Sequence, residues 1–370
     1  MNYRKKVDMW YSVTNESSVF TPSVLLYPDR IEENIRRMIA MAGDVNRLRP
    51  HVKTHKIPEL IQLQVGMGIR KFKCATLSEV KMVAENGGED ILLAYPLLGP
   101  AIAWFLEFTD RFPGITFAIT IDSLAAAHML DTAAFQKGQT VRVFIDLDTG
   151  MHRTGIIPGS AEILVDYIHS SENLHFAGFH FYDGHVHEID LAERKAHIDR
   201  DFESVAQLVK NVNEKGIEVQ EIACGGTPTF PIHAQYPERT LCPGTPILWD
   251  AGYTETIPDL DFLPAAVIAG RVISKPHGNV CFDLGYKAFA SEMPHPRLQF
   301  LNFEPGEVVN HSEEHLVVTP DREEDFEIGE LVYALPKHVC PTMALHEKVY
   351  VVNSHQVTGT WDVTARKRIY

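Results

Sequence analysis

The sequence has few cysteines, no long apolar run and no excess of basic residues. Its five cysteines are an odd number spread over 370 residues, which is typical of free thiols in a reducing compartment rather than of a disulfide framework. No apolar run is long enough to span a bilayer, and Met1 does not begin a signal segment. The formal net charge of −15 argues against general nucleic-acid binding. We therefore expect a cytoplasmic protein that binds neither membranes nor nucleic acids.

What the sequence does have is a repeated couplet of a short apolar run and an amphipathic stretch. Such alternation predicts parallel strands joined by crossover helices. Eight strands in roughly 200 residues match a (β/α)8 TIM-like barrel better than an open doubly wound sheet. The eight predicted strands are Ser23–Tyr27, Arg47–Lys53, Lys71–Ala75, Ile91–Tyr95, Ile115–Thr120, Val141–Leu147, Leu174–Tyr182 and Val219–Cys224.

The length and composition of the apolar segments change towards the C-terminus. The apolar runs there are short, rich in β-branched and aromatic residues, and separated by Pro, Gly, Asn and Asp, which is typical of a β-rich domain. We expect an α/β barrel in residues 21–262 and a β-rich domain in residues 263–370, to which residues 1–20 could add a strand.

A wholly basic cluster ends the second predicted strand. Residues 49–56 (RPHVKTHK) contain two lysines, two histidines and an arginine. A lysine crowded by other cations has a depressed pKa and is a better nucleophile near neutral pH. Barrel enzymes place reactive groups at the carboxyl ends of strands, so we interpret the cluster as a cofactor-binding element. The alternative is a basic strand end on the surface.

A glycine-rich turn follows the eighth predicted strand. Gly225 and Gly226 let backbone N–H groups approach an anion closely, and Thr227 adds a hydroxyl donor. Many barrels bind a phosphate in the loops after their late strands, although a lone Gly-Gly-Thr is more often a tight turn. Gly244 and Thr245 offer a second, weaker set of donors.

These parts suit one cofactor. An amine after strand 2, a phosphate loop after strand 8 and an arginine, Arg153, after strand 6 match the aldehyde, the phosphate and the ring of pyridoxal 5′-phosphate. The lysine would form the Schiff base, and the arginine would pair with the phenolate oxygen or the ring nitrogen.

Several segments together resemble the D-threonine aldolase and D-serine dehydratase family, fold-type III pyridoxal enzymes related to bacterial alanine racemase. The resemblance runs in order over nearly the whole chain, and its first and last motifs are the specific ones. The matching segments are residues 49–56 (RPHVKTHK), 148–155 (DTGMHRTG), 225–229 (GGTPT), 243–245 (PGT) with Asp250 and Tyr253, 312–315 (SEEH) and 336–342 (PKHVCPT).

The resemblance implies roles for single residues. It implies that Lys53 is the Schiff-base lysine, with Lys56 as a rival on the same stretch. Arg153 is implied as the polar anchor of the cofactor, and Tyr182 falls where related racemases place an aromatic or histidine side chain. Enzymes of this fold usually build their site across a dimer, so we expect a homodimer.

His338 and Cys340 form a candidate metal pair. In an extended segment, residues i and i+2 point to one face, and imidazole and thiolate are ordinary zinc ligands. The alternative is a buried cysteine beside a core histidine. The resemblance implies the ligand role, because the enzymes concerned are metal-activated. It also implies that aldolases commonly pair this histidine with aspartate and dehydratases with cysteine, so Cys340 favours zinc over manganese or magnesium.

The base for the β-hydroxyl proton is expected among three histidines, His180, His185 and His187, and we select His185. The predicted function is a pyridoxal-phosphate- and metal-dependent lyase of β-hydroxy D-amino acids, first a D-threonine aldolase. The closest alternative is a D-serine or 3-hydroxy-D-aspartate dehydratase. A racemase and a non-catalytic pyridoxal-phosphate-binding protein are further alternatives.

Overall fold

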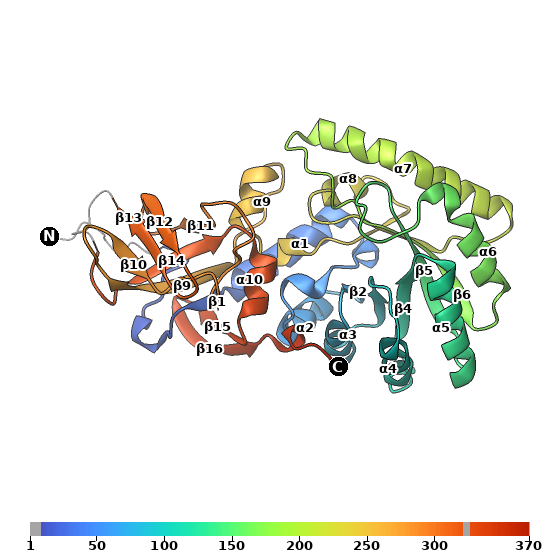
Figure 1. The fold of residues 1–370 in the computed structure, drawn as a ribbon, viewed down its shortest axis with the longest axis horizontal. Helices are drawn as coiled ribbons and strands as arrows, with labels where there is room; N and C mark the ends of the chain where they lie inside the picture. Colours follow the sequence, from blue (N-terminus) through green and yellow to red (C-terminus); the bar gives the residue numbers. More distant parts are fainter. Residues whose placement is uncertain (1–8, 321–325, 370) are drawn as a thin grey trace. The chain divides into compact units, whose positions relative to one another are not determined.

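The computed structural model describes residues 9–320 and 326–369. The chain forms two compact units (Figure 1). Within the described residues, the barrel unit comprises Arg36–Lys53, Pro58–Gly244 and residues 367–369. The β unit comprises residues 9–35, Thr54–Ile57 and residues 245–320 and 326–366. The chain therefore passes from one unit to the other several times.

The barrel unit contains a curved sheet of seven parallel strands. A short segment joins its two edges, because Leu48 forms a parallel bridge with Leu241 of the last strand and His51 forms one with Lys73 of the first. The predicted barrel architecture is confirmed. In sheet order, the strands are β2 (Lys71–Cys74), β3 (Asp90–Leu93), β4 (Thr116–Ile121), β5 (Val141–Leu147), β6 (Leu174–Phe181), β7 (Glu221–Cys224) and β8 (Arg239–Leu241).

Helices connect these strands, as the alternating pattern predicted. Polar side chains cap the first turns of some of these helices. The Thr76 hydroxyl accepts a hydrogen bond from Glu79 N at the start of α3, and Asp190 caps α7 in the same way. None of the helices in the described part of the chain combines the length and apolar character needed to cross a membrane. The helices are α2 (Pro58–Gly66), α3 (Leu77–Glu85), α4 (Pro100–Thr109), α5 (Leu124–Lys137), α6 (Glu162–Ser170), α7 (Leu191–Glu214) and α8 (Phe230–His233).

One layer of buried side chains fills part of the barrel interior. Its members come from β3 to β7 and from the residue after β8, and Phe144 is the largest of them. This layer fixes the curvature of the sheet below the strand ends that carry the candidate site residues. It consists of Leu92, Ala118, Phe144, Ala177, Ala223 and Cys242.

Two strand predictions were wrong. Ser23–Tyr27 was expected to open the barrel, but β1 (Ser23–Leu26) pairs with β9 and β15 of the β unit. A short apolar strand before a helix has the same local pattern in either sheet, so only its distant partners decide. Arg47–Lys53 forms no regular strand, since single bridges flank Pro50, which lacks a backbone N–H.

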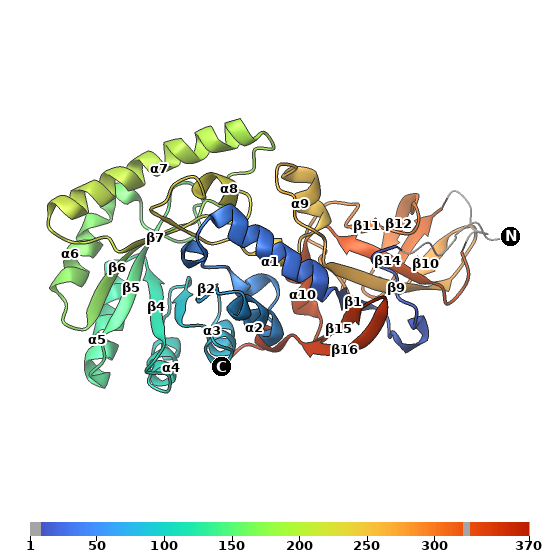
Figure 2. The ribbon, with the colours of Figure 1, turned by 180° about the vertical axis from the view of Figure 1, so that it is seen from behind.

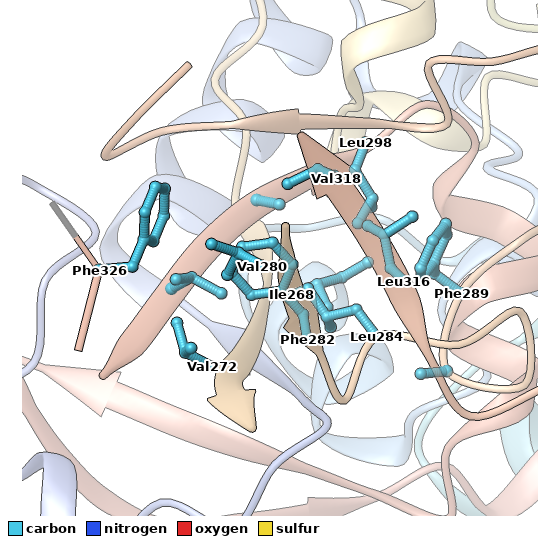
Figure 3. Packing of buried hydrophobic residues seen from close by; sticks show 13 residues of the cluster. Ile268, Val272, Val280, Phe282, Leu284, Phe289, Leu298, Leu316, Val318 and Phe326 are labelled. Carbon is cyan, nitrogen blue, oxygen red and sulfur yellow. The ribbon is translucent and has the colours of Figure 1, made fainter. Parts of the chain in front are cut away.

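The β unit consists mainly of a nine-stranded sheet, which confirms the expected β-rich C-terminal part. Its core is a cluster of aliphatic and aromatic side chains, including Phe282 and Leu316, that point toward one another from several strands (Figure 3). The remaining α-helices of the described residues are α1 (Pro28–Ala42), α9 (Ala251–Thr256) and α10 (Val339–Leu345) (Figure 2). The strands are β1, β9 (Ala266–Ser274), β10 (Val280–Phe282), β11 (Leu298–Phe300), β12 (Glu307–His311), β13 (Leu316–Thr319), β14 (Leu331–Pro336), β15 (Lys348–Asn353) and β16 (Gln356–Asp362).

His55 predicts an acid-sensitive stability of the β unit. Its side chain is buried, and its Nδ1 accepts a hydrogen bond from Ile57 N. Burial lowers the pKa of His55 to about 3, so the folded state keeps the ring neutral. The unfolded chain takes up a proton near pH 6.5, and stability therefore falls as the pH drops from 6.5 towards 3. We expect a loss of about 2 kcal/mol from this group between pH 7 and pH 5.

Urea unfolding at the two pH values measures this loss. His55→Asn keeps an acceptor for Ile57 N but does not titrate, so its pH dependence should be smaller by that amount. The exposed His175 provides a control, because its replacement by asparagine should leave the pH dependence unchanged. An equal fall in the wild type and in His55→Asn would contradict the prediction.

Candidate active site

Lys53 lies at the edge of the barrel unit, in the short 3-10 helix Val52–Thr54. Its backbone N–H donates to His51 Nδ1 at 3.3 Å, and His51 N in turn donates to Pro243 O at 2.8 Å. These bonds fix the segment between β8 and β2. The side chain of Lys53 is half-buried, so its amine is held by the barrel but is not sealed inside it.

Three cationic groups surround the ring of Tyr182. Lys53 Nζ, Lys73 Nζ and Arg153 Cζ lie 5.9, 5.3 and 5.2 Å from the ring centre, respectively. Among the residues that the structure describes, neither Lys53 nor Arg153 makes an ion pair. Positive charge without carboxylate partners favours a bound anion, and the amine and guanidinium of this group fit an anionic aldehyde cofactor.

Lys73 belongs to a buried chain of polar groups that the sequence did not lead us to expect. Its Nζ lies 3.0 Å from His180 Nε2, and His180 Nδ1 lies 2.6 Å from Asp146 Oδ1. Because Nδ1–H donates to the carboxylate, Nε2 accepts from the lysine. Burial and the Lys73 charge lower the pKa of His180, and burial is the main cause that lowers the pKa of Lys73. The chain thus holds a neutral imidazole between an amine and a carboxylate.

Arg49 belongs to the same basic cluster as Lys53 in the sequence, but its side chain forms ion pairs inside the barrel. Its guanidinium bonds to Glu221 at 2.8 Å and to Asp90 at 2.9 Å. These are the first residues of β7 and β3, at the opposite end of the strands from a barrel site. Burial alone would raise the pKa of both carboxyls, but Arg49 holds both values below their usual range.

The glycine-rich turn after β7 has the conformation that the sequence suggested. Gly225 has φ of 73°, and a Cβ there would lie 2.6 Å from the ring of His233. A Cβ on Gly226 would lie 3.1 Å from Tyr182, so the turn approaches this ring as closely as glycine allows. Thr227 Oγ1 accepts from Gly244 N at 3.3 Å, which brings the two predicted donor segments together within the barrel unit.

Asp183 supports this turn from the next loop. Its carboxylate accepts from Thr229 Oγ1 at 2.9 Å and contacts His233 Nε2 at 2.7 Å. All three side chains are buried. Since Thr229 also accepts from Gly226 N at 3.2 Å, Asp183 positions the turn without facing the anion itself. In the sequence, only the position of Asp183 directly after Tyr182 indicated that it could belong to the site.

The expected base, His185, is engaged by helix α7. Its Nε2 lies 2.8 Å from Asp201 Oδ2, and a Cβ on Gly150 would lie 2.5 Å from the same nitrogen. His187 is exposed. Of the three histidines, only His180 lies in the buried chain that reaches Tyr182 through Lys73.

The predicted metal pair meets at the start of α10 in the β unit. The reasoning from an extended segment was wrong in one respect: His338 is the extended N-cap residue, whereas Cys340 lies in the first helical turn. The two side chains are nevertheless hydrogen-bonded. His338 Nδ1 lies 2.6 Å from Glu292 Oε1. Burial lowers the pKa of His338, but the hydrogen bonds and charges of Cys340 and Glu292 raise it to about 9. With Nδ1–H donating to the carboxylate, a metal ion would replace the proton on Nε2.

Further oxygen groups of the β unit surround the thiol. The hydroxyls of Thr54 and Thr245 lie 3.2 and 3.6 Å from Cys340 Sγ. Asp250 accepts from Val339 N at 3.0 Å and so holds the first turn of α10. Imidazole and thiolate, with hydroxyl groups beside the thiol, fit a zinc-class ion that keeps open positions.

The predicted site residues thus form two groups. Those of the barrel unit are Lys53, Arg153, Tyr182, His185, Gly225, Gly226, Thr227 and Gly244, and those of the β unit are Thr245, His338 and Cys340.

Comparison with models of protein families shows which family the chain belongs to. The model described as alanine racemase, N-terminal domain, matches residues 27–245. The chain belongs to this family. A second model, for a serine dehydratase domain, matches residues 265–352. The pair of matches, in this order, confirms the resemblance to the D-threonine aldolase and D-serine dehydratase group.

Relatives of this family member extend over almost its whole length. D-threonine aldolase of Arthrobacter sp is 29% identical over 359 residues, or 94% of this chain and 93% of the relative. The 3-hydroxy-D-aspartate aldolase of Paracoccus denitrificans (strain Pd 1222) is 28% identical over 374 residues, or 96% and 94%. The crystal structure of D-threonine aldolase from Filomicrobium marinum has a TM-score of 0.85 at 25% identity and covers 97% of this chain and 98% of that one. All three relatives are lyases.

Proposed function

We propose that this protein is a pyridoxal-phosphate-dependent and metal-dependent lyase of β-hydroxy D-amino acids, and specifically a D-threonine aldolase that yields glycine and acetaldehyde. The observation that carries the proposal is the group of Lys53, Lys73 and Arg153 around one tyrosine ring. Its support is the similarity to aldolases acting on D-threonine and 3-hydroxy-D-aspartate.

Lys53 would provide the amine that holds the cofactor through its aldehyde. The turn at Gly225 and Gly226 would hold the phosphate chiefly through the Thr227 hydroxyl, because the two glycine N–H groups already donate to Phe181 O and Thr229 Oγ1. Arg153 would pair with a polar atom of the ring. When bound, pyridoxal phosphate supplies an electron sink for the pair of electrons left on Cα. The part of these residues is to bind and orient it.

The reaction needs a base, because the β-hydroxyl proton must leave as the Cα–Cβ bond breaks and the Cβ–O bond becomes a carbonyl. His180 can take up this proton through Lys73. Asp146 orients its buried ring, its Nε2 accepts from the Lys73 amine, and that amine reaches the Tyr182 ring, so Lys73 passes one proton to His180 as it takes up another. The expectation from the sequence that His185 is the base stays a prediction, and single replacements distinguish the two.

His338 and Cys340 would hold the divalent ion, for which zinc is favoured over manganese or magnesium. There the ion would supply Lewis acidity to the substrate hydroxyl. Glu292 orients the histidine ligand and Asp250 fixes the helical turn between the two ligands.

A product assay with the purified full-length protein tests the proposed function. With added pyridoxal phosphate and Zn²⁺ or Mn²⁺, D-threonine should give glycine and acetaldehyde in equal amounts, and L-threonine should give neither. Ammonia and a keto acid from D-serine, with no aldehyde from D-threonine, would overturn the aldolase assignment. Activity that survives chelation would instead favour a racemase.

The dehydratase is the second candidate, and Cys340 is the observation that favours it. A thiolate ligand is softer than a carboxylate and selects zinc, and the sequence motif around Cys340 resembles that of dehydratases. The carbon–oxygen bond would break in place of Cα–Cβ, so the two candidates differ in whether ammonia is released. The expected homodimer is checked on the same preparation by sedimentation.

Replacement of His180 by glutamine is expected to lower kcat by about 10²-fold, with little change in KM, because it removes the oriented base and not a binding group. Steady-state kinetics on D-threonine measure the effect. The exposed His187→Gln serves as the control and should keep wild-type kcat. If His185→Gln loses the same factor while His180→Gln does not, the base is the residue expected from the sequence.

A further inference from the structure

His185 belongs to a group of metal-binding side chains that includes none of the residues assigned to the cofactor. His185, His197 and Asp201 each offer one ligand atom, and these atoms lie within 4.8 Å of one another. All three residues are half-buried and belong to the barrel unit. The group is therefore shielded from most of the solvent but remains accessible to a small ion.

Helix α7 supplies two of the three residues. His197 and Asp201 are separated by four positions, so their side chains lie on the same face of the helix, one turn apart. His185 reaches this face from the loop after β6, with its Nε2 2.8 Å from Asp201 Oδ2. The three groups thus converge from two elements, as protein ligands to one ion usually do.

The hydrogen bonds of His197 leave a lone pair inside the group. His197 Nδ1 lies 2.6 Å from Glu188 Oε1, so Nδ1–H donates and Nε2 of the neutral ring is unprotonated. This nitrogen lies 3.7 Å from Asp201 Oδ2. A metal ion between these two acceptors would stabilise the contact, and the alternative is a proton on His197 Nε2. Glu188 stands in the outer position that orients a metal-bound histidine.

Two further polar atoms of these side chains lie outside the proposed coordination. His185 Nδ1 and Glu188 Oε2 are buried and have no hydrogen-bond partner in the described part of the chain. The group as a whole combines two imidazoles with two carboxylates, so with neutral histidines it carries excess negative charge. Such a set is completed by a divalent cation, which also draws the imidazoles into fixed orientations.

The distances suit a small tetrahedral ion. Metal bonds of about 2.0–2.1 Å place neighbouring ligand atoms roughly 3.3–3.4 Å apart. The observed separations of 2.8 and 3.7 Å lie on either side of this value. The third separation, between the two histidines, is at most 4.8 Å, so side-chain rotations would bring the three atoms into a coordination shell.

We propose that His185, His197 and Asp201 bind a divalent transition-metal ion, Zn²⁺ in the first place, with water in the fourth position. The ion ties α7 to the loop after β6, which carries Tyr182 and Asp183. It is distinct from the ion proposed at His338 and Cys340, and the proposal does not depend on the proposed function. In this arrangement His185 is a ligand and proton transfer is left to His180.

Zinc titration of the full-length, metal-stripped protein tests the proposal. The wild type should bind one more equivalent of Zn²⁺ per chain than His197→Gln or Asp201→Asn. Glu188→Gln should keep the stoichiometry but bind this equivalent about 10- to 100-fold more weakly, as expected for an outer partner. His128→Gln is the matched control: His128 also lies on a helix, α5, and bonds to Tyr167, and its replacement should change nothing.

Cobalt spectra provide a measurement that does not require the α7 variants to fold. In Cys340→Ala protein, Co²⁺ should give the ligand-field bands of a nitrogen and oxygen site and no thiolate charge-transfer band. Absence of these bands would overturn the proposal, as would equal zinc stoichiometry in the wild type and His197→Gln. In either case His197 would be an imidazolium that bridges Glu188 and Asp201. Neither outcome affects the product assay on D-threonine.

Discussion

Lys53→Ala is expected to lower the rate of D-threonine cleavage by about 10³-fold or more, a loss typical of removing a group that bonds covalently during catalysis. Lys53 is the half-buried amine of the basic segment and faces the Tyr182 ring without an ion-pair partner in the described residues. The visible absorption band of the protein with pyridoxal phosphate should disappear in the same variant, because no other amine replaces the lost bond.

Two other lysines are alternative candidates for the bond to the cofactor, and their replacement distinguishes them from Lys53. Lys56 is the rival on the same stretch, and its backbone has a left-handed φ of 58°. Lys73 is the rival that only the structure reveals, since its buried amine is also near Tyr182. Lys56→Ala and Lys73→Met should keep the absorption band, although Lys73→Met should lose activity through His180. Borohydride reduction followed by peptide mass spectrometry should place the label on Lys53; a label on Lys73 or Lys56 would contradict the assignment.

The architecture could be predicted from the sequence wherever local pattern and tertiary pairing agree. Val141–Leu147 was predicted with the bounds that β5 has, because a short segment dominated by Val, Ile, Leu and Phe between turns is typical of a buried parallel strand. β1 was assigned to the wrong sheet, since its partners β9 and β15 lie more than two hundred residues further along the chain. β8 was missed, because its three residues are too few to show a period.

The site was predictable only in the parts that motifs describe. The glycines after β7 and the pair at residues 338 and 340 are contiguous patterns with a chemical meaning. Lys73 has no such pattern: a lysine in Lys-Phe-Lys-Cys suggests the solvent side of a strand. Its burial depends on His180, which lies 107 residues away. Arg49 was overestimated for the same reason. Its carboxylate partners lie far along the chain, and these ion pairs hold its charge away from the proposed cofactor site.

His338→Ala should lower activity by about 10²-fold, and added metal should not restore it, because the ion loses its nitrogen ligand and with it the Lewis acidity offered to the substrate hydroxyl. Chelation should lower wild-type activity to the same level, whereas added Zn²⁺ or Mn²⁺ should restore it. The absorption band with pyridoxal phosphate should persist in the variant, which separates metal loss from cofactor loss. The exposed His277→Ala in the same unit should behave as the wild type.

Cys340→Asp tests whether residue 340 sets the metal preference of the protein. The carboxylate keeps two protein ligands but replaces a soft donor by a hard one, so we expect activity to shift from Zn²⁺ towards Mn²⁺ or Mg²⁺. Thr54 and Thr245, whose hydroxyls lie within 3.6 Å of the thiol, can donate to the new carboxylate. Assays across the three metals measure the shift. If metal preference stays the same in Cys340→Asp and His338→Ala remains fully active, the pair is structural, and a metal-independent racemase becomes the better assignment.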